Sequence, residues 1–177
     1  MNSCAQGRAL APIIHVTDPD HAGEILLRTY ELDEALGFHV VQSSQAMFLA
    51  LHELRSGNTA AAARWASRSL EAATDYSPTF VAQTISVIVA TVKRHSPSDA
   101  AILLGALRAH RPRKQQAGTQ AEIDAESRYE TSLRRQLGPE FDSLYTKGQA
   151  LDEAAMITLA FRQLDAIIES SGQSDGS

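Results

Sequence analysis

The sequence predicts an all-α protein whose helices form antiparallel pairs in a short α-solenoid. A helix-opening unit recurs three times, beginning at Asp18, Asn58 and Ser96, and each copy precedes an alanine-rich apolar stretch. Between the copies, apolar residues follow helical spacing. The alanines at the same offset in the three units are Ala22, Ala62 and Ala100. A period of 38 to 40 residues fits a repeat of two short helices.

Proline and glycine mark the expected helix ends. Proline follows a capping residue at Asp18-Pro19, Ser77-Pro78 and Ser96-Pro97, where its missing N–H costs nothing. A capping box opens the helix after residue 119. Glycine accepts the left-handed conformation that follows a helix, and the candidate stops are Gly37, Gly57, Gly118 and Gly138.

The first three helices are predicted from apolar stripes. The first stripe comprises Ala22, Ile25, Leu26, Thr29, Leu32 and Leu36. The second comprises Ala46, Leu49, Ala50 and Leu54. The third, which we pair with the second, comprises Ala62, Trp65, Ala66, Ser69, Leu70 and Ala73.

The next stretch, residues 81–92, is apolar nearly all round, which predicts a central helix. Val81, Ile85, Ile88 and Val92 form its stripe, and Val87 and Val89 lie off it. Residues 86–92 are rich enough in β-branched side chains to form a strand, although the preceding cap and the length favour a helix. A further apolar helix carries Ala100, Leu103, Leu104 and Leu107.

The C-terminal part predicts a helical cap over residues 112–169. A polar connector precedes a charged helix at 119–137, a short amphipathic helix at 139–147 and a last helix at 152–169. We therefore expect a partial N-terminal helix or tail at 1–16, repeats at 17–111, the cap, and a disordered Ser/Gly-rich tail at 170–177.

Composition narrows the functional classes. The 177 residues carry a formal net charge of -5, which disfavours nucleic acid as the main partner. Cys4 is the only cysteine, so an intramolecular disulfide and a cysteine-based metal site are excluded. We expect a cytoplasmic protein with no membrane span and no signal peptide.

The sequence has no catalytic motif in a context that supports catalysis. It has no Gly-x-x-x-x-Gly-Lys-Ser/Thr phosphate loop. Its one Gly-x-Ser-x-Gly string, residues 172–176, falls in the expected Ser/Gly-rich tail and not after a strand, where a nucleophile motif belongs. His52-Glu53 begins like a zinc-protease helix, but Ser56 replaces the second histidine. The acids on the charged helix suggest a solvated face; they are Glu122, Asp124, Glu126 and Glu130. We expect no enzyme, no cofactor and no metal; an all-α enzyme with an unrecognised site is the least favoured alternative.

One basic stretch, residues 93–114, could bind an anion or an acidic partner. Its cations are Lys93, Arg94, Arg108, Arg111, Arg113 and Lys114, and Asp99 is the only acid among them. The alternative interpretation is a solvated loop and a helix end whose cations offset the helix dipole.

Two segments resemble the C-terminal tetratricopeptide-like region of bacterial LuxR/MalT-type and adenylate-cyclase-linked ATP-binding transcriptional regulators. The first is Pro97, Ala100, Ala101, Leu103, Leu104, Gly105 and Ala106; the second is Leu137, Gly138, Phe141, Tyr145, Gly148, Leu151 and Ala154. The resemblance spans residues 17–164, with His95 in place of a usual glycine and Tyr145 in place of a frequent tryptophan. It implies a tetratricopeptide-like sensor without the ATPase or the DNA-binding helix-turn-helix.

The expected function is a non-enzymatic helical-repeat interaction or sensor module of a signalling or transcriptional regulator. A protein partner or self-association is expected, and a small effector is compatible. Because a solenoid end needs a cover, Leu10, Ile13 and Ile14 are the candidate interface. The alternative is a nucleic-acid-associated regulator that uses the basic 93–114 stretch, although direct nucleic-acid binding is not expected.

Overall fold

A computed structural model describes residues 19–76, 78–111 and 120–174. These residues form eight α-helices and contain no strand. The helices are α2 (Pro19–Ala35), α3 (His39–Arg55), α4 (Thr59–Tyr76), α5 (Pro78–Val92), α6 (Pro97–His110), α7 (Gln120–Leu137), α8 (Glu140–Gln149) and α9 (Glu153–Ser174). The all-α prediction is confirmed, and the stretch with the strand alternative is helical.

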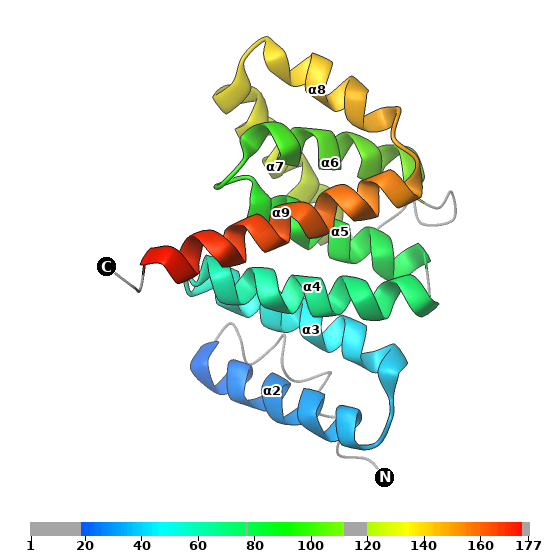
Figure 1. Cartoon of the computed structure of the whole chain (residues 1–177), viewed down its shortest axis with the longest axis vertical. Helices are drawn as coiled ribbons and strands as arrows, with labels where there is room; N and C mark the ends of the chain where they lie inside the picture. The colour runs from blue at the N-terminus through cyan, green and yellow to red at the C-terminus, as the bar shows by residue number, and fades with distance from the viewer. Residues whose placement is uncertain (1–18, 77, 112–119, 175–177) are drawn as a thin grey trace.

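The helices stack along the long axis of the molecule, from α2 at one end to α8 at the other (Figure 1). From α2 to α7, each helix packs against the helix that follows it in the sequence. In addition, α6 packs closely on α8. The last helix, α9, returns across the stack and contacts α4, α5 and α6. Neighbouring helices therefore supply much of the packing, and α9 adds contacts between its own residues and helices far earlier in the chain.

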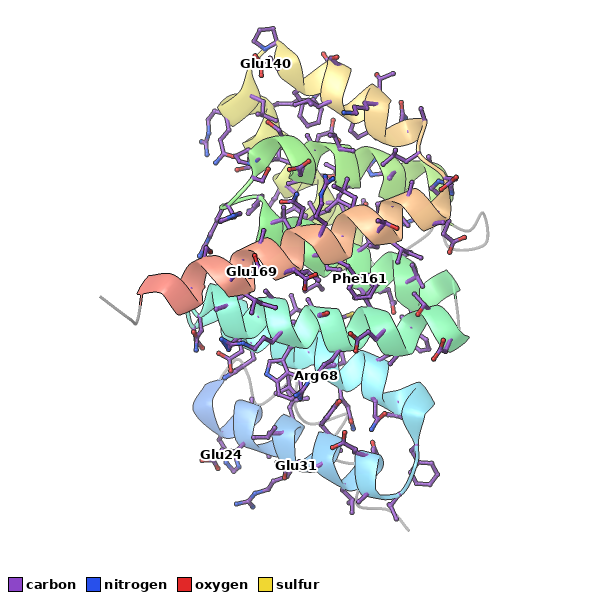
Figure 2. The ribbon with its side chains drawn as sticks, viewed as in Figure 1. Glu24, Glu31, Arg68, Glu140, Phe161 and Glu169 are labelled. Carbon is purple, nitrogen blue, oxygen red and sulfur yellow. The ribbon has the colours of Figure 1, made fainter. Side chains whose placement is uncertain are left out.

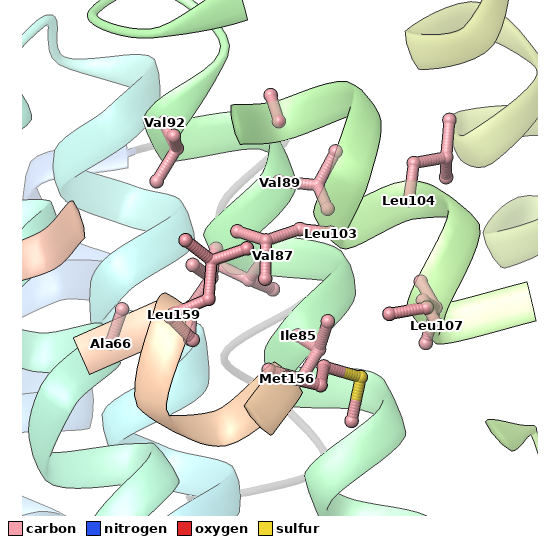
Figure 3. Close-up of a cluster of buried hydrophobic side chains, with 14 of the residues drawn as sticks. Ala66, Ile85, Val87, Val89, Val92, Leu103, Leu104, Leu107, Met156 and Leu159 are labelled. Atoms are coloured by element: carbon pink, nitrogen blue, oxygen red, sulfur yellow. The ribbon is translucent and has the colours of Figure 1, made fainter. Parts of the chain in front are cut away.

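The core lies around α5 and α6, where apolar side chains from α9 also meet (Figure 3). The predicted apolar stripe of α5 is buried, and so are Val87 and Val89, which lie off that stripe. The prediction that α5 is a central helix is therefore confirmed. The repeat alanines Ala62 and Ala100 are fully buried. Small side chains at these two positions allow neighbouring helices to approach closely.

The predicted stripe of α2 is wrong at its C-terminal end. Ala22 and Leu26 are buried, but Leu32 and Leu36 are 43% and 56% exposed. The buried face continues instead through Tyr30, whose ring meets Trp65 of α4 edge-on at 5.1 Å, and through the fully buried Asp33. Figure 2 shows Arg68 reaching from α4 toward α2; its guanidinium lies 4.8 Å from the centroid of the same tryptophan.

A hydrogen bond explains the buried carboxylate. Gln45 Nε2 donates to Asp33 Oδ2 at 2.7 Å, and both side chains are buried between α2 and α3. A hydrogen-bonded polar pair can occupy an interior face that apolar spacing alone would assign to other residues. The i, i+4 row through Leu26 and Tyr30 thus turns toward α3, and Leu32 and Leu36 turn away.

Two glycines set the contact between α6 and α8. A Cβ at Gly105 would fall on the carbonyl group of Tyr145, and a Cβ at Gly148 would fall on the carbonyl group of Ile102. Phe141 stacks on Tyr145 with ring centroids 5.5 Å apart. The two segments that carry the family resemblance therefore meet at this backbone contact.

The tail prediction needs one correction. Residues 170–174 belong to α9, although a disordered tail was expected from residue 170. The hydroxyls of Ser170 and Ser171 donate to the carbonyl oxygen of Ile167 at 2.9 Å, which is compatible with continued helix. Serine content alone therefore placed the helix end too early.

Candidate functional site

A groove of about 890 Å³ is the candidate functional site. Alternate helices α3, α5 and α7 line it, with one residue from the end of α6, and α9 contributes none of its lining residues. This volume is in the range of small-ligand sites. The lining residues are Ser44, Met47, Phe48, Leu51, Leu54, Arg55, Phe80, Gln83, Ser86, Val87, Ala90, Lys93, Arg94, Arg111, Ala125, Glu126, Arg128 and Tyr129.

One part of the groove is apolar. Met47 and Phe48 of α3 and Leu51 one turn later contribute to it, and Phe80 and Val87 come from α5. Met47, Leu51 and Phe80 are partly buried and pack against the main core cluster. These side chains are therefore held by the core on one side and face the groove on the other.

The other part of the groove is basic. Arg55 ends α3, Lys93 and Arg94 directly follow α5, and Arg128 lies inside α7. The Lys93 ammonium nitrogen lies 4.9 Å from the centroid of the Tyr129 ring. Within the described ranges, no ion pair joins any of these four cations to an acid.

Burial changes the ionisation of two groups here. It lowers the pKa of Lys93 below its usual range, and the positive charge of Arg94 lowers it further. Burial also raises the pKa of Tyr129, whereas the nearby charges of Arg128 and Arg55 act in the opposite direction. Lys93, Arg55 and Arg128 therefore all lie close enough to the Tyr129 ring to interact with it electrostatically.

Glu126 is the acid of the groove, and its charge is already compensated. Its side chain is 1% exposed and forms ion pairs with Arg111 and with Arg108 Nε, the latter at 3.2 Å. Arg108 also lies 3.7 Å from Glu130. The prediction of a solvated acidic face is therefore wrong for Glu126, because two arginines from the end of α6 cover it.

The structure separates the predicted basic residues into two groups. Lys93 and Arg94 face the groove without an acidic partner in the described part of the chain, whereas Arg108 and Arg111 hold Glu126. Arg113 and Lys114 lie outside the described residues, as do the candidate interface residues Leu10, Ile13 and Ile14.

Sequence reasoning missed Arg55, Arg128 and the apolar wall. Arg55 precedes Lys93 by the same 38-residue spacing that separates the second and third repeat units, so the register of the repeat could have identified it. Arg128 carries no such signal, because its position depends on how α7 packs beside α5.

Two of the described histidines, His52 and His110, lie in other contacts of the fold. The His52 ring packs against Gly23, and His110 Nε2 lies 2.6 Å from the carbonyl oxygen of Leu151. Among the described residues, no group of three or more histidine, cysteine or acidic side chains is arranged to hold a metal ion.

A second surface lies at the α2 end of the stack. The large apolar side chains that are most exposed in the described ranges all belong to α2 and the turn after it. They are Leu27, Leu32, Leu36 and Phe38, and each is between 40% and 56% exposed.

Comparisons of the chain with protein-family models, curated proteins and solved structures gave no match. The family resemblance consequently depends on the residues quoted for it. None of the helices in the described ranges combines the length and the apolar character needed to cross a bilayer.

Proposed function

We propose that this chain is a non-enzymatic helical-repeat module that binds an effector or a protein in the groove between α3, α5 and α7. The observation that carries the proposal is the groove itself, where an apolar wall adjoins cations with no acidic partner in the described residues. Pockets of this kind, apolar with a few convergent polar groups, are the usual ligand sites of proteins.

A tetratricopeptide-like solenoid is part of this proposal. In repeat proteins of paired helices, equivalent helices of successive pairs line one continuous binding surface. The period of 38 to 40 residues and the alternate helices α3, α5 and α7 along the groove support that arrangement. On the basis of the resemblance to LuxR/MalT-type regulators, we also propose that the module has a regulatory role in the cytoplasm.

The groove's side chains favour binding over catalysis. Nucleophilic catalysis needs an activated nucleophile with a base within hydrogen-bond reach. The described lining offers the hydroxyls of Ser44, Ser86 and Tyr129, and its carboxylate, Glu126, is engaged by two arginines. We therefore propose that a bound ligand leaves the groove chemically unchanged.

A groove-filling variant tests the proposal. Ser86 lines the groove and is partly exposed, so Ser86→Phe should fill it while the core stays intact. Arg64→Gln, on an exposed position of α4 outside the groove, is the control. Tagged wild-type protein and both variants are incubated with native lysate, and bound metabolites and proteins are identified by mass spectrometry.

A ligand retained by wild type and Arg64→Gln but lost by Ser86→Phe would support the groove as the binding site. If every ligand is retained equally by all three proteins, the groove is not the site and the proposal is refuted.

Self-association at the α2 end is a second candidate, favoured by the exposed side chains of Leu27, Leu32, Leu36 and Phe38. Leu36, which directly follows α2, lies one helical turn after Leu32 and shares a face with it, and an exposed apolar face can mark an interface. Light scattering at micromolar concentration, with Leu32→Asp and Leu36→Asp as variants, tests it. A dimer that these substitutions dissociate would support the interface, and a monomer for the unsubstituted protein would exclude it at that concentration.

A further inference from the structure

We infer that the ligand of the groove is a small amphipathic anion, with an apolar body against the α3 wall and one carboxylate or phosphate head among Arg55, Lys93 and Arg128. The inference depends on the proposed function and specifies the chemical class of its ligand. It commits to a small molecule and not to a peptide or a nucleic acid.

The first support is the separation of apolar and basic residues along the groove. On α3, the side chains of Met47 and Leu51 precede Arg55. On α5, Val87 and Ala90 precede Lys93 in the same way. Both helices therefore change from apolar to basic toward their C-terminal ends, and the two basic ends meet at the Tyr129 ring.

The second support is positive charge that has no acidic partner among the described side chains. The buried acid nearest these cations, Glu126, already has two arginine partners. Placing Lys93 partly out of water beside Arg94 lowers its pKa and so costs folding free energy. An anionic head group would supply the missing partner, and charge-assisted hydrogen bonds to a carboxylate or phosphate are among the stronger polar interactions in proteins.

Interaction with helix dipoles does not explain why Arg55, Lys93 and Arg128 all lie around the Tyr129 ring. Cations at the ends of α3 and α5 do complement the carboxyl-terminal dipole of each helix. Arg128, however, lies eight residues after Gln120, the first residue of α7, and well before its end at Leu137. It is the combination of this mid-helix cation with the other two around one ring that indicates an anion site.

The size of the groove favours a small molecule over a polymer. Its volume of about 890 Å³ is in the range that encloses one small ligand. Nucleic-acid binding draws its affinity from several phosphate contacts along an extended basic surface. Here the cations lie at the C-terminal ends of α3 and α5 and on α7, and the rest of the α3 and α5 wall is mainly apolar, with Ser44, Gln83 and Ser86 as its polar members.

The experiment measures binding by isothermal titration calorimetry with four probes: decanoate and octanoate below their micelle concentrations, decanol below its solubility limit, and inorganic phosphate. We expect decanoate to bind about tenfold or more tightly than decanol, because a charge-assisted head-group contact is worth about that factor. Octanoate should bind about tenfold more weakly than decanoate if both extra methylenes are buried. Inorganic phosphate should bind weakest, and added salt should reduce decanoate binding.

Variants assign the two ends of the ligand. Arg55→Gln and Lys93→Met should each weaken decanoate about tenfold and leave decanol unchanged. Met47→Gln should weaken decanoate and decanol by the same factor, because it changes the wall and not the head-group site. Arg64→Gln should change neither, and thermal unfolding of each variant confirms that it is folded.

Two further arms use a labelled acidic peptide and a single-stranded DNA oligonucleotide. If either binds through Arg55 and Lys93 while decanoate does not, the small-molecule inference is overturned and the groove remains a binding site. Equal affinity for decanoate and decanol would overturn the anionic head group. Absence of all probe binding, with Ser86→Phe still losing a ligand from lysate, would overturn the inference and leave the proposed function standing.

Discussion

Replacing Gly105 by alanine should separate α6 from α8. The added Cβ would lie 3.0 Å from the carbonyl carbon of Tyr145 and 3.2 Å from the amide nitrogen of Gln149, and it would be closer still to the Tyr145 oxygen. Ordinary van der Waals contact at a Cβ begins near 3.4 Å. All three neighbouring atoms belong to the backbone of α8, so no side-chain rotation can relieve the overlap.

The expected loss follows from two opposing effects. Overpacking a well-packed interior costs about 1–3 kcal/mol, and a backbone neighbour that cannot rotate places this case at about 3 kcal/mol. Alanine recovers about 1 kcal/mol through its higher helix propensity. The net destabilisation is therefore about 2 kcal/mol, which corresponds to a fall in Tm of about 4–8 °C for a chain of this size.

Urea unfolding followed by circular dichroism and by Trp65 fluorescence measures the effect, and coincident transitions would support two-state behaviour. Gly172→Ala in α9 is the matched control, because nothing lies within 4 Å of its added Cβ. It should be neutral or slightly stabilising. If Gly105→Ala is as stable as Gly172→Ala, the close backbone contact between α6 and α8 does not exist as described.

Three further changes test other parts of the structure. Glu126→Ala should cost about 3 kcal/mol in urea unfolding, because two arginines lose their buried partner; a loss under about 1 kcal/mol would contradict the burial. Lys93→Met should raise stability at neutral pH. Because folding lowers the Lys93 pKa from about 10.5, the charged form costs stability below the folded pKa, and this cost disappears as pH rises through the window between the folded and unfolded values. The advantage of Lys93→Met should therefore shrink toward pH 10.5, and an advantage that does not change with pH would contradict the assignment. Ala62→Leu should overpack a fully buried helix contact and cost about 1–3 kcal/mol by thermal unfolding, whereas an unchanged Tm would place Ala62 elsewhere.

Local signals predicted the helices well, because caps, prolines and apolar spacing act within a few residues. Pro97 begins α6, and the Ser96 hydroxyl accepts from the amide of Asp99 as an N-cap. The misassigned face of α2 has a different origin. Asp33 is buried with one carboxylate oxygen hydrogen-bonded to Gln45 of another helix, and hydropathy contains no information about such a partner.

The groove was likewise predictable where it depends on local sequence, and not where it depends on how helices pack. The basic stretch drew attention to Lys93 and Arg94, which do line the groove. That Arg108 and Arg111 instead bind Glu126 depends on how α6 and α7 pack, which spacing along the chain cannot specify. The apolar wall could not be predicted for a related reason. The spacing of Met47 and Leu51 is typical of core residues, and only the packing of the other helices leaves them at the edge of a groove.

The return of α9 across the stack has a consequence for synthesis of the protein. Met156 and Leu159 of α9 complete the cluster around Ile85 and Leu103 (Figure 3), so those earlier residues keep exposed apolar surface until α9 leaves the ribosome. Short-range pairing can begin during translation, but the final closure joins segments far apart in the chain, which slows folding. A nascent chain that stalls before residue 153 would therefore be a substrate for chaperones and proteases.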